Sequence, residues 1–137
     1  MWRFLNEEEP VERIMRNKGL AKLGDNLVNL CYSLAKSQVL GEATGEKVKD
    51  RVLANAIRST SVYSKYGRRT DSGVAADAYE AIMAYLWLTG KISIEEIVAS
   101  LGNNIEITLE TSRKREDEIA TLAFQNLLES LMHLFPI

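Results

Sequence analysis

The pattern of apolar and polar residues along the chain predicts helices and almost no strand. Across residues 19–40, apolar side chains recur three and four positions apart, which is the spacing of an amphipathic helix. The predicted inward stripe consists of Leu20, Leu23, Leu27, Leu30, Cys31 and Leu34. Across residues 74–89 nearly every side chain is apolar, so we expect a central, buried helix that ends at Gly90.

Four more helices complete the expected fold. They are predicted over residues 10–17, 46–63, 93–102 and 112–135, and the third of these begins with a capping box formed by Ser93 and Glu96. The long last helix is expected to turn Ile119, Leu122, Leu127, Leu131 and Leu134 to one side. Alternation at residues 105–109 indicates only a brief extended segment. No repeat or flexible linker divides the chain, so residues 1–137 are predicted to form a single all-α domain.

Composition excludes a protein drawn to nucleic acid by its overall charge. The chain is 46% hydrophobic and 26% charged, with a net charge of −2, so RNA contact would need a local basic cluster. The polar loop at residues 64–73 offers one, with Lys65, Arg68 and Arg69 as the candidates; a merely solvated turn is the alternative. The basic run at 113–115 is followed directly by an acidic run at 116–118, which favours a solvated helix face.

The sequence also bears on cellular location. Cys31 is the only cysteine, so the chain can form no internal disulfide, and its apolar neighbours predict a buried, inert thiol. The first ten residues lack the apolar core of a signal peptide, and no stretch approaches the ~20 apolar residues of a membrane span. We therefore expect a cytoplasmic protein with no membrane partner. His133 has no partner at zinc-ligand spacing.

Two carboxylates stand out within the apolar segment at residues 74–88. Asp77 and Glu80 are its only acidic residues, and their spacing places both on one helix face, with Cβ atoms about 5–6 Å apart. Unpaired carboxylates in an apolar interior are costly, so a Lys, an Arg or a metal ion should face them. The small residues Gly73, Ala76 and Ala84 would leave room for a ligand. The alternative is that the pair is solvated or salt-bridged to the basic loop.

A second acidic residue lies on the earlier amphipathic helix. Asp25 points away from the leucine stripe, toward Ala21 and Asn29, and alone would be an ordinary surface acid. Gly24 beside it costs about 1 kcal/mol within a helix, so its presence indicates that another part of the chain passes close to the backbone there.

Together the two motifs resemble the ribonuclease III family over residues 18–101. That family has a signature of the form Leu-Glu-aromatic-Leu-Gly-Asp on one helix and Asp-x-x-Glu-Ala on a later one. Here they read Leu20-Ala21-Lys22-Leu23-Gly24-Asp25 and Asp77-Ala78-Tyr79-Glu80-Ala81, in the same order. The resemblance implies the all-α helical bundle of a ribonuclease III-type endonuclease domain.

One position departs from the signature. Its Glu is Ala21 here, and an earlier acidic position is Lys18; in the bacterial-type enzymes that Glu helps to hold the metal. The Mini-III branch, which lacks a double-stranded-RNA-binding domain, also has Ala there and is catalytic. Residues 19–25 and the basic loop at 66–73 are similar to that branch.

The resemblance implies a function as well as a fold. Asp25, Asp77 and Glu80 would hold Mg²⁺, with Mn²⁺ as a substitute, and Asp25 and Glu80 would be catalytic. Lys65, Arg68 and Arg69 would contact double-stranded RNA, with Lys18 and Lys22 as further candidates. Family members are homodimers with one site per subunit, and the helix carrying Tyr85 and Trp87 could supply part of that interface or be entirely internal.

Three other functions stay open from the residues alone. The first is a non-catalytic RNA-binding or assembly module of the same fold, since Ala21 replaces a metal-holding Glu. The second is an all-α nucleotide pyrophosphohydrolase, although such enzymes gather acidic pairs on two helices and only one such pair is clear here. The third is a purely structural helical bundle.

Overall fold

The computed structural model describes residues 2–135, which form helices and no strand. The α-helices are α1 (Val11–Ile14), α2 (Lys18–Leu40), α3 (Asp50–Arg58), α4 (Ser72–Leu88), α5 (Ile94–Asn104) and α6 (Arg113–Leu131). Two short 3-10 helices, η1 (Ser61–Tyr66) and η2 (Met132–Leu134), follow α3 and α6. The predicted all-α fold is confirmed. None of the helices described has the length and apolar character that a membrane span requires.

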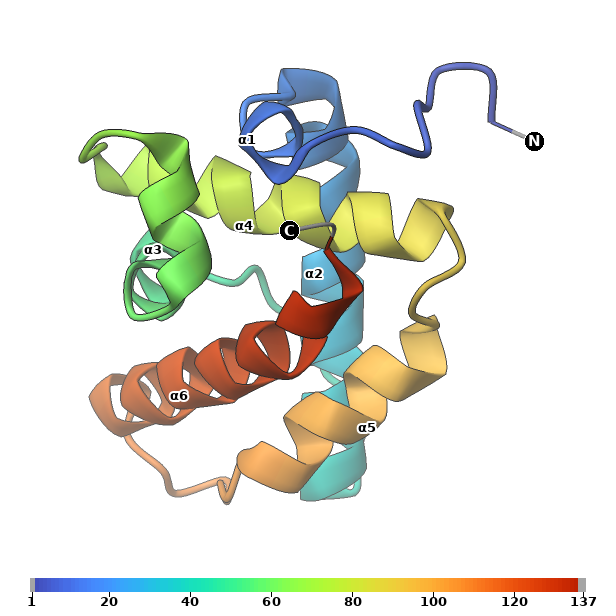
Figure 1. The fold of residues 1–137 in the computed structure, drawn as a ribbon. Helices are drawn as coiled ribbons and strands as arrows, with labels where there is room; N and C mark the ends of the chain where they lie inside the picture. The colour runs from blue at the N-terminus through green and yellow to red at the C-terminus, as the bar shows by residue number, and fades with distance from the viewer. Residues whose placement is uncertain (1, 136–137) are drawn as a thin grey trace.

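Helix α4 is the centre of the molecule. It runs across the middle, with α2 crossing behind it, α3 at one end and α6 and α5 below (Figure 1). Its most extensive contacts are with α2 and α3, and most of its residues are buried. The helix ends where Gly90 adopts a positive φ of 75°, a conformation that favours glycine. The predicted central helix is therefore confirmed.

Helix α2 turns only part of the predicted stripe inward, since Leu20, Leu27 and Cys31 are buried as predicted. The other three leucines of the stripe, Leu23, Leu30 and Leu34, are 45%, 49% and 43% exposed and lie on the surface. The buried residues include several small ones and are Leu20, Ala21, Gly24, Leu27, Val28, Cys31, Tyr32 and Ala35. Small side chains let α2 approach α4 closely, which is why the face with less apolar area is the buried one. Cys31 is buried as expected, and burial raises the pKa of its thiol to about 12.

The predicted helix over residues 46–63 is divided in two. Helix α3 ends at Arg58, because the Ser59 hydroxyl donates a hydrogen bond to the carbonyl of Asn55 at 2.9 Å and the Thr60 hydroxyl donates to that of Ile57 at 2.7 Å. Such side-chain bonds offer the backbone carbonyls an alternative to helical pairing. The chain then forms η1 before the basic loop.

Other helix boundaries move for similar local reasons. Helix α1 ends at Ile14 rather than at 17, and Asn17 instead caps α2 by accepting a hydrogen bond from the Leu20 amide at 3.0 Å. The predicted capping box of α5 is present, with Ser93 and Glu96 each accepting from the other's backbone amide at 3.0 Å.

The acidic run at the start of α6 is not the solvated face that was predicted. Glu116 is only 7% exposed, and its carboxylate accepts a hydrogen bond from the Tyr32 hydroxyl at 2.7 Å and two from the Lys36 ammonium at 3.0 Å. Lys36 also pairs with Glu46, whose second oxygen lies 2.9 Å from Arg113. These five residues form the α2–α6 charge cluster. By contrast, Leu122, predicted to face inward on α6, is largely exposed.

Tyr85 belongs to the internal core and not to a free surface. Its hydroxyl donates to the Asn6 carbonyl at 3.0 Å and accepts from the Glu9 amide at 3.2 Å, which ties the N-terminal segment to α4. Of the two aromatic residues considered for a dimer interface, only Trp87 is exposed.

Candidate active site

The candidate site is built on the closest approach of α2 to α4. A Cβ atom added at Gly24 would lie 1.9 Å from the carbonyl oxygen of Glu80 and 2.4 Å from its carbonyl carbon. Only glycine permits the two backbones to approach so closely. The prediction that another segment passes next to Gly24 is thus confirmed, and the crossing brings Asp25 beside Glu80.

Glu80 is a buried carboxyl without a basic partner. Its exposed fraction is 4%, and within residues 2–135 no Lys or Arg forms an ion pair with it. Burial raises the pKa of Glu80 to about 9, and the hydrogen bond and negative charge of Asp25 act in the same direction. At neutral pH the carboxyl therefore keeps its proton.

Asp25 is the ionised member of the pair. Its Oδ1 accepts hydrogen bonds from the Lys47 ammonium at 2.8 Å and from the Asn29 side-chain amide at 3.1 Å. The hydrogen bond from Lys47, followed by that shared with Glu80, lowers the pKa of Asp25. Two adjacent carboxyls thus have pKa values shifted in opposite directions, an arrangement typical of sites that move protons or bind cations.

Asp77 lies one turn before Glu80 on α4 and is half-exposed. The Lys18 ammonium lies 3.1 Å from its Oδ2, and the charge of Asp77 also contributes to the raised pKa of Glu80. A cationic group facing the acidic pair was predicted, and Lys18 supplies it; the basic loop does not. The expected space around the pair is not observed, because Ala76 and Ala84 are buried in helix packing.

The three carboxyls do not form a ready metal-binding set in this structure. Within the described part of the chain, no three Asp, Glu, His or Cys side chains are placed to hold one metal ion. Lysine ammonium groups instead contact Asp25 and Asp77, and Glu80 is protonated. The donor set nevertheless fits a hard divalent cation, since it consists of carboxylate oxygens whose negative charge is here neutralised by two lysines and a proton.

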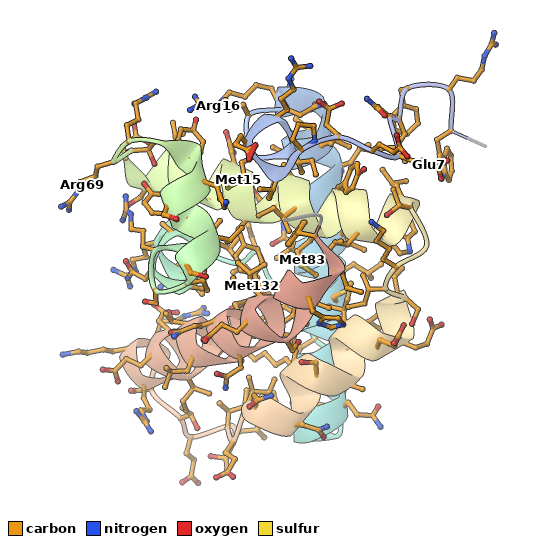
Figure 2. The ribbon with its side chains drawn as sticks, in the orientation of Figure 1. Glu7, Met15, Arg16, Arg69, Met83 and Met132 are labelled. Atoms are coloured by element: carbon orange, nitrogen blue, oxygen red, sulfur yellow. The ribbon has the colours of Figure 1, made fainter. Side chains whose placement is uncertain are left out.

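The basic loop lies immediately before α4. It turns at Gly67, whose φ is 88°, and exposes Lys65, Arg68 and Arg69, none of which forms an ion pair within residues 2–135. Arg69 projects away from the body of the protein (Figure 2). Because α4 begins at Ser72 and rises about 1.5 Å per residue, Asp77 is about 7 Å further along its axis. The loop thus leads directly into the helix that carries Asp77 and Glu80.

Two arginines that the sequence did not single out hold this loop in place. Arg16 donates a hydrogen bond to the Tyr66 carbonyl, and its guanidinium lies 4.1 Å from the centre of the Tyr66 ring. Arg58 donates to the Thr70 carbonyl at 2.6 Å, so both ends of the loop are fixed. Lys47 was missed as well, because nothing in its local sequence marks a contact with a residue 22 positions earlier.

The candidate site combines a buried carboxyl pair at a helix crossing with a basic loop that leads into one of the two helices. The sequence model of the ribonuclease III family matches residues 18–135, and the chain belongs to that family. The match runs from the start of α2 to the end of the described residues, and it is consistent with a Mini-III-like catalytic domain. No curated protein sequence matches the chain. Family membership supports a ribonuclease function.

Proposed function

We propose that the protein is a divalent-metal-dependent endoribonuclease that hydrolyses phosphodiester bonds of double-stranded RNA. The observation that carries this proposal is the α2–α4 crossing at Gly24. It sets the buried, protonated Glu80 beside the ionised Asp25, and the basic loop leads into the helix that carries Glu80. A purely structural bundle has no use for such an uncompensated buried carboxyl.

Asp25, Asp77 and Glu80 would hold the cation, either Mg²⁺ or Mn²⁺, since carboxylate oxygens are the ligands these ions prefer. The bound ion would supply a water of lowered pKa and stabilise charge on the phosphate. Lys18 and Lys47 are both more than half exposed, so their pairs with Asp77 and Asp25 are weak and open readily. Glu80 would give up its proton as the site takes up the cation.

The RNA would be bound by shape and by phosphate contacts. Lys65, Arg68 and Arg69 are exposed and form no ion pair within residues 2–135, and Arg16 and Arg58 fix the backbone of the loop. Cations presented on a fixed loop can contact phosphates of an A-form duplex with little loss of backbone freedom. In-line attack of water on the phosphodiester would leave a 5′-phosphate and a 3′-hydroxyl.

We propose further that two copies form a homodimer through the exposed leucine stripe of α2. Leu23, Leu30 and Leu34 lie in one line on the helix surface. The stripe ends at an apolar hollow of about 530 Å³, bordered by Leu34 and Val39 of α2 and by Val98 of α5. A row of exposed leucines on a helix that also carries Asp25 suits a two-fold interface with a catalytic site on each subunit.

Incubation with end-labelled double-stranded RNA tests the enzymatic proposal. We expect cleavage with Mg²⁺, none with EDTA, and none by the Glu80→Gln variant, with 5′-phosphate ends on the products. Glu106→Gln removes an exposed acid far along the chain and serves as the control that retains cleavage. An intact duplex that still shifts on a native gel would instead indicate a non-catalytic RNA-binding module. If neither occurs, hydrolysis of nucleoside triphosphates should be assayed.

Light scattering tests the dimer. Leu30→Glu places a charge in the middle of the stripe and should convert the dimer to a monomer, whereas Leu122→Glu alters an equally exposed leucine on α6 and should not. A monomeric wild-type protein, or equal effects of the two variants, would contradict the proposed interface.

A further inference from the structure

Lys47 has a position that neither the sequence motifs nor the family match assigns. Its ammonium lies 2.8 Å from Asp25 Oδ1, and 65% of its side chain is exposed. An exposed ion pair of this kind contributes little to stability, so the fold does not depend on it. The contact does place a long, largely exposed cation beside the Asp25 member of the carboxyl pair.

The backbone around Lys47 is fixed while its side chain is free. The Val48 amide donates to Asn29 Oδ1 at 2.7 Å, and Asn29 also donates to Asp25, so one residue of α2 positions both partners of the ion pair. On the other side, the amide of Glu46 donates to the Ser33 hydroxyl at 3.0 Å. The Glu46 carboxylate in turn belongs to the α2–α6 charge cluster.

The charges at the site determine where the Lys47 ammonium lies once a divalent cation is bound. The carboxylates of Asp25 and Asp77 would repel a phosphodiester if no cation neutralised them, and here Lys47 and Lys18 do so. A divalent cation on Asp25 competes with Lys47 for the same oxygen, and the released ammonium then stands at the edge of the site. A free ammonium beside bound metal is suited to contact phosphate oxygens.

We propose that Lys47 is a substrate-binding residue of the active site, which holds Asp25 in the metal-free protein and contacts the RNA phosphate next to the scissile bond once Asp25 binds the cation. This inference rests on the proposed function and assigns Lys47 to the same site. The Lys47 side chain would thus weaken metal binding, by competing for Asp25, and strengthen phosphate binding.

The Lys47→Met variant separates the two roles. Removing the competing ammonium should tighten Mn²⁺ binding, measured by calorimetry without RNA, by about two- to fivefold, the equivalent of one exposed ion pair. At saturating metal the same variant should lose about ten- to a hundredfold in kcat/KM for duplex RNA. Lys47→Arg should restore most of the cleavage.

Lys49→Met is the matched control. Lys49 lies on the same segment, but its ammonium contacts Asp117 on α6 at 2.7 Å, away from the site. Its removal should change neither Mn²⁺ affinity nor cleavage by more than about twofold.

Each outcome bears on the proposal. Equal or weaker Mn²⁺ binding by Lys47→Met would overturn the competition for Asp25, and unchanged cleavage would overturn the phosphate contact. A wild-type protein that cleaves, with Lys47→Met behaving like Lys49→Met, would reject the role of Lys47 and leave the proposed function intact. A wild-type protein that never cleaves would overturn the proposed function and this inference with it.

Discussion

Two glutamates are buried against α2, and their surroundings differ completely. Glu116 is 7% exposed and receives hydrogen bonds from Tyr32 and Lys36. Glu80 is 4% exposed and shares a hydrogen bond with another carboxyl, that of Asp25, without forming an ion pair within residues 2–135. The two side chains are buried to a similar degree, but only Glu116 is paired with a cation. A buried carboxylate that is paired with a cation holds elements together, whereas one that stays protonated because no cation faces it marks a place where a ligand can supply the positive charge.

The lysines show the same contrast. Burial of Lys36 acts to lower its pKa, but the hydrogen bonds to Glu46 and Glu116 outweigh it and raise the pKa. That ammonium lies inside the α2–α6 charge cluster. Lys47 and Lys18, which face the candidate site, are exposed and held by one carboxylate each. The buried ion pairs of the α2–α6 charge cluster should therefore stay intact, whereas the exposed ion pairs at the candidate site can break when a cation binds.

The largest expected effect comes from exchanging each glutamate for its amide. Glu80→Gln should reduce RNA cleavage by roughly 10³-fold or more, because a cation ligand is lost. Glu116→Gln should leave cleavage per folded molecule unchanged and lower the free energy of unfolding by about 1–3 kcal/mol, because Lys36 and Tyr32 lose a charged partner. Cleavage assays and chemical denaturation of both variants check this. Similar losses of cleavage in both would erase the distinction between the two regions.

The next effect concerns the backbone contact that creates the site. Gly24→Ala would drive a methyl group into the backbone of Glu80, and we expect unfolding to become easier by at least about 3 kcal/mol, with loss of activity. Gly102→Ala on α5 faces open space and should instead stabilise the protein by up to about 1 kcal/mol. Thermal unfolding of both variants is the measurement. A neutral Gly24→Ala would mean that α2 and α4 lie further apart than described.

Stability without metal should depend on pH through Glu80. Its pKa is about 9 in the folded protein and about 4.3 in the unfolded chain, so the folded state binds the extra proton. The resulting stability is fully present below about pH 4 and is lost as pH rises through 9. At pH 7, in EDTA, Glu80→Gln should be more stable than wild type by about 1–3 kcal/mol, and the difference should grow toward pH 9. If the free energies of unfolding of the two proteins change in parallel with pH across this range, the raised pKa of Glu80 is contradicted.

The smallest effect is expected on RNA binding, where the unpaired arginines of the basic loop are compared with a paired arginine of the α2–α6 charge cluster. Replacing Arg68 and Arg69 by Ala should weaken RNA binding and reduce the salt dependence of log K by about 2, one unit for each lost phosphate contact. Arg113→Ala removes an arginine already paired with Glu46 and should leave that slope unchanged. Binding titrations at several salt concentrations distinguish the two. An equal slope in both variants would remove the loop from the proposed RNA surface.

The sequence predicted much of this architecture and the acidic residues of the site, but not the lysines that contact them. The apolar run of α4, the capping box of α5 and the close approach at Gly24 all follow from local residue types. The inward face of α2 was predicted only in part. Hydrophobicity favoured burial of Leu23, Leu30 and Leu34, which are exposed. Close packing against α4 instead buries the small residues Ala21, Gly24 and Ala35. The partners of Asp25, Asp77 and Glu116 are Lys47, Lys18 and Lys36, and these pairings depend on how helices distant in sequence meet in space.

We propose that the carboxyls at the α2–α4 crossing bind a divalent cation and that Glu80 must release its proton when they do. Calorimetric titration of Mn²⁺ into the wild-type protein at pH 7, in buffers of different ionisation enthalpy, measures both binding and proton release. We expect saturable binding that releases about one proton, from Glu80, and no such release in Glu80→Gln. Absence of binding, or equal proton release by the two proteins, would contradict the account.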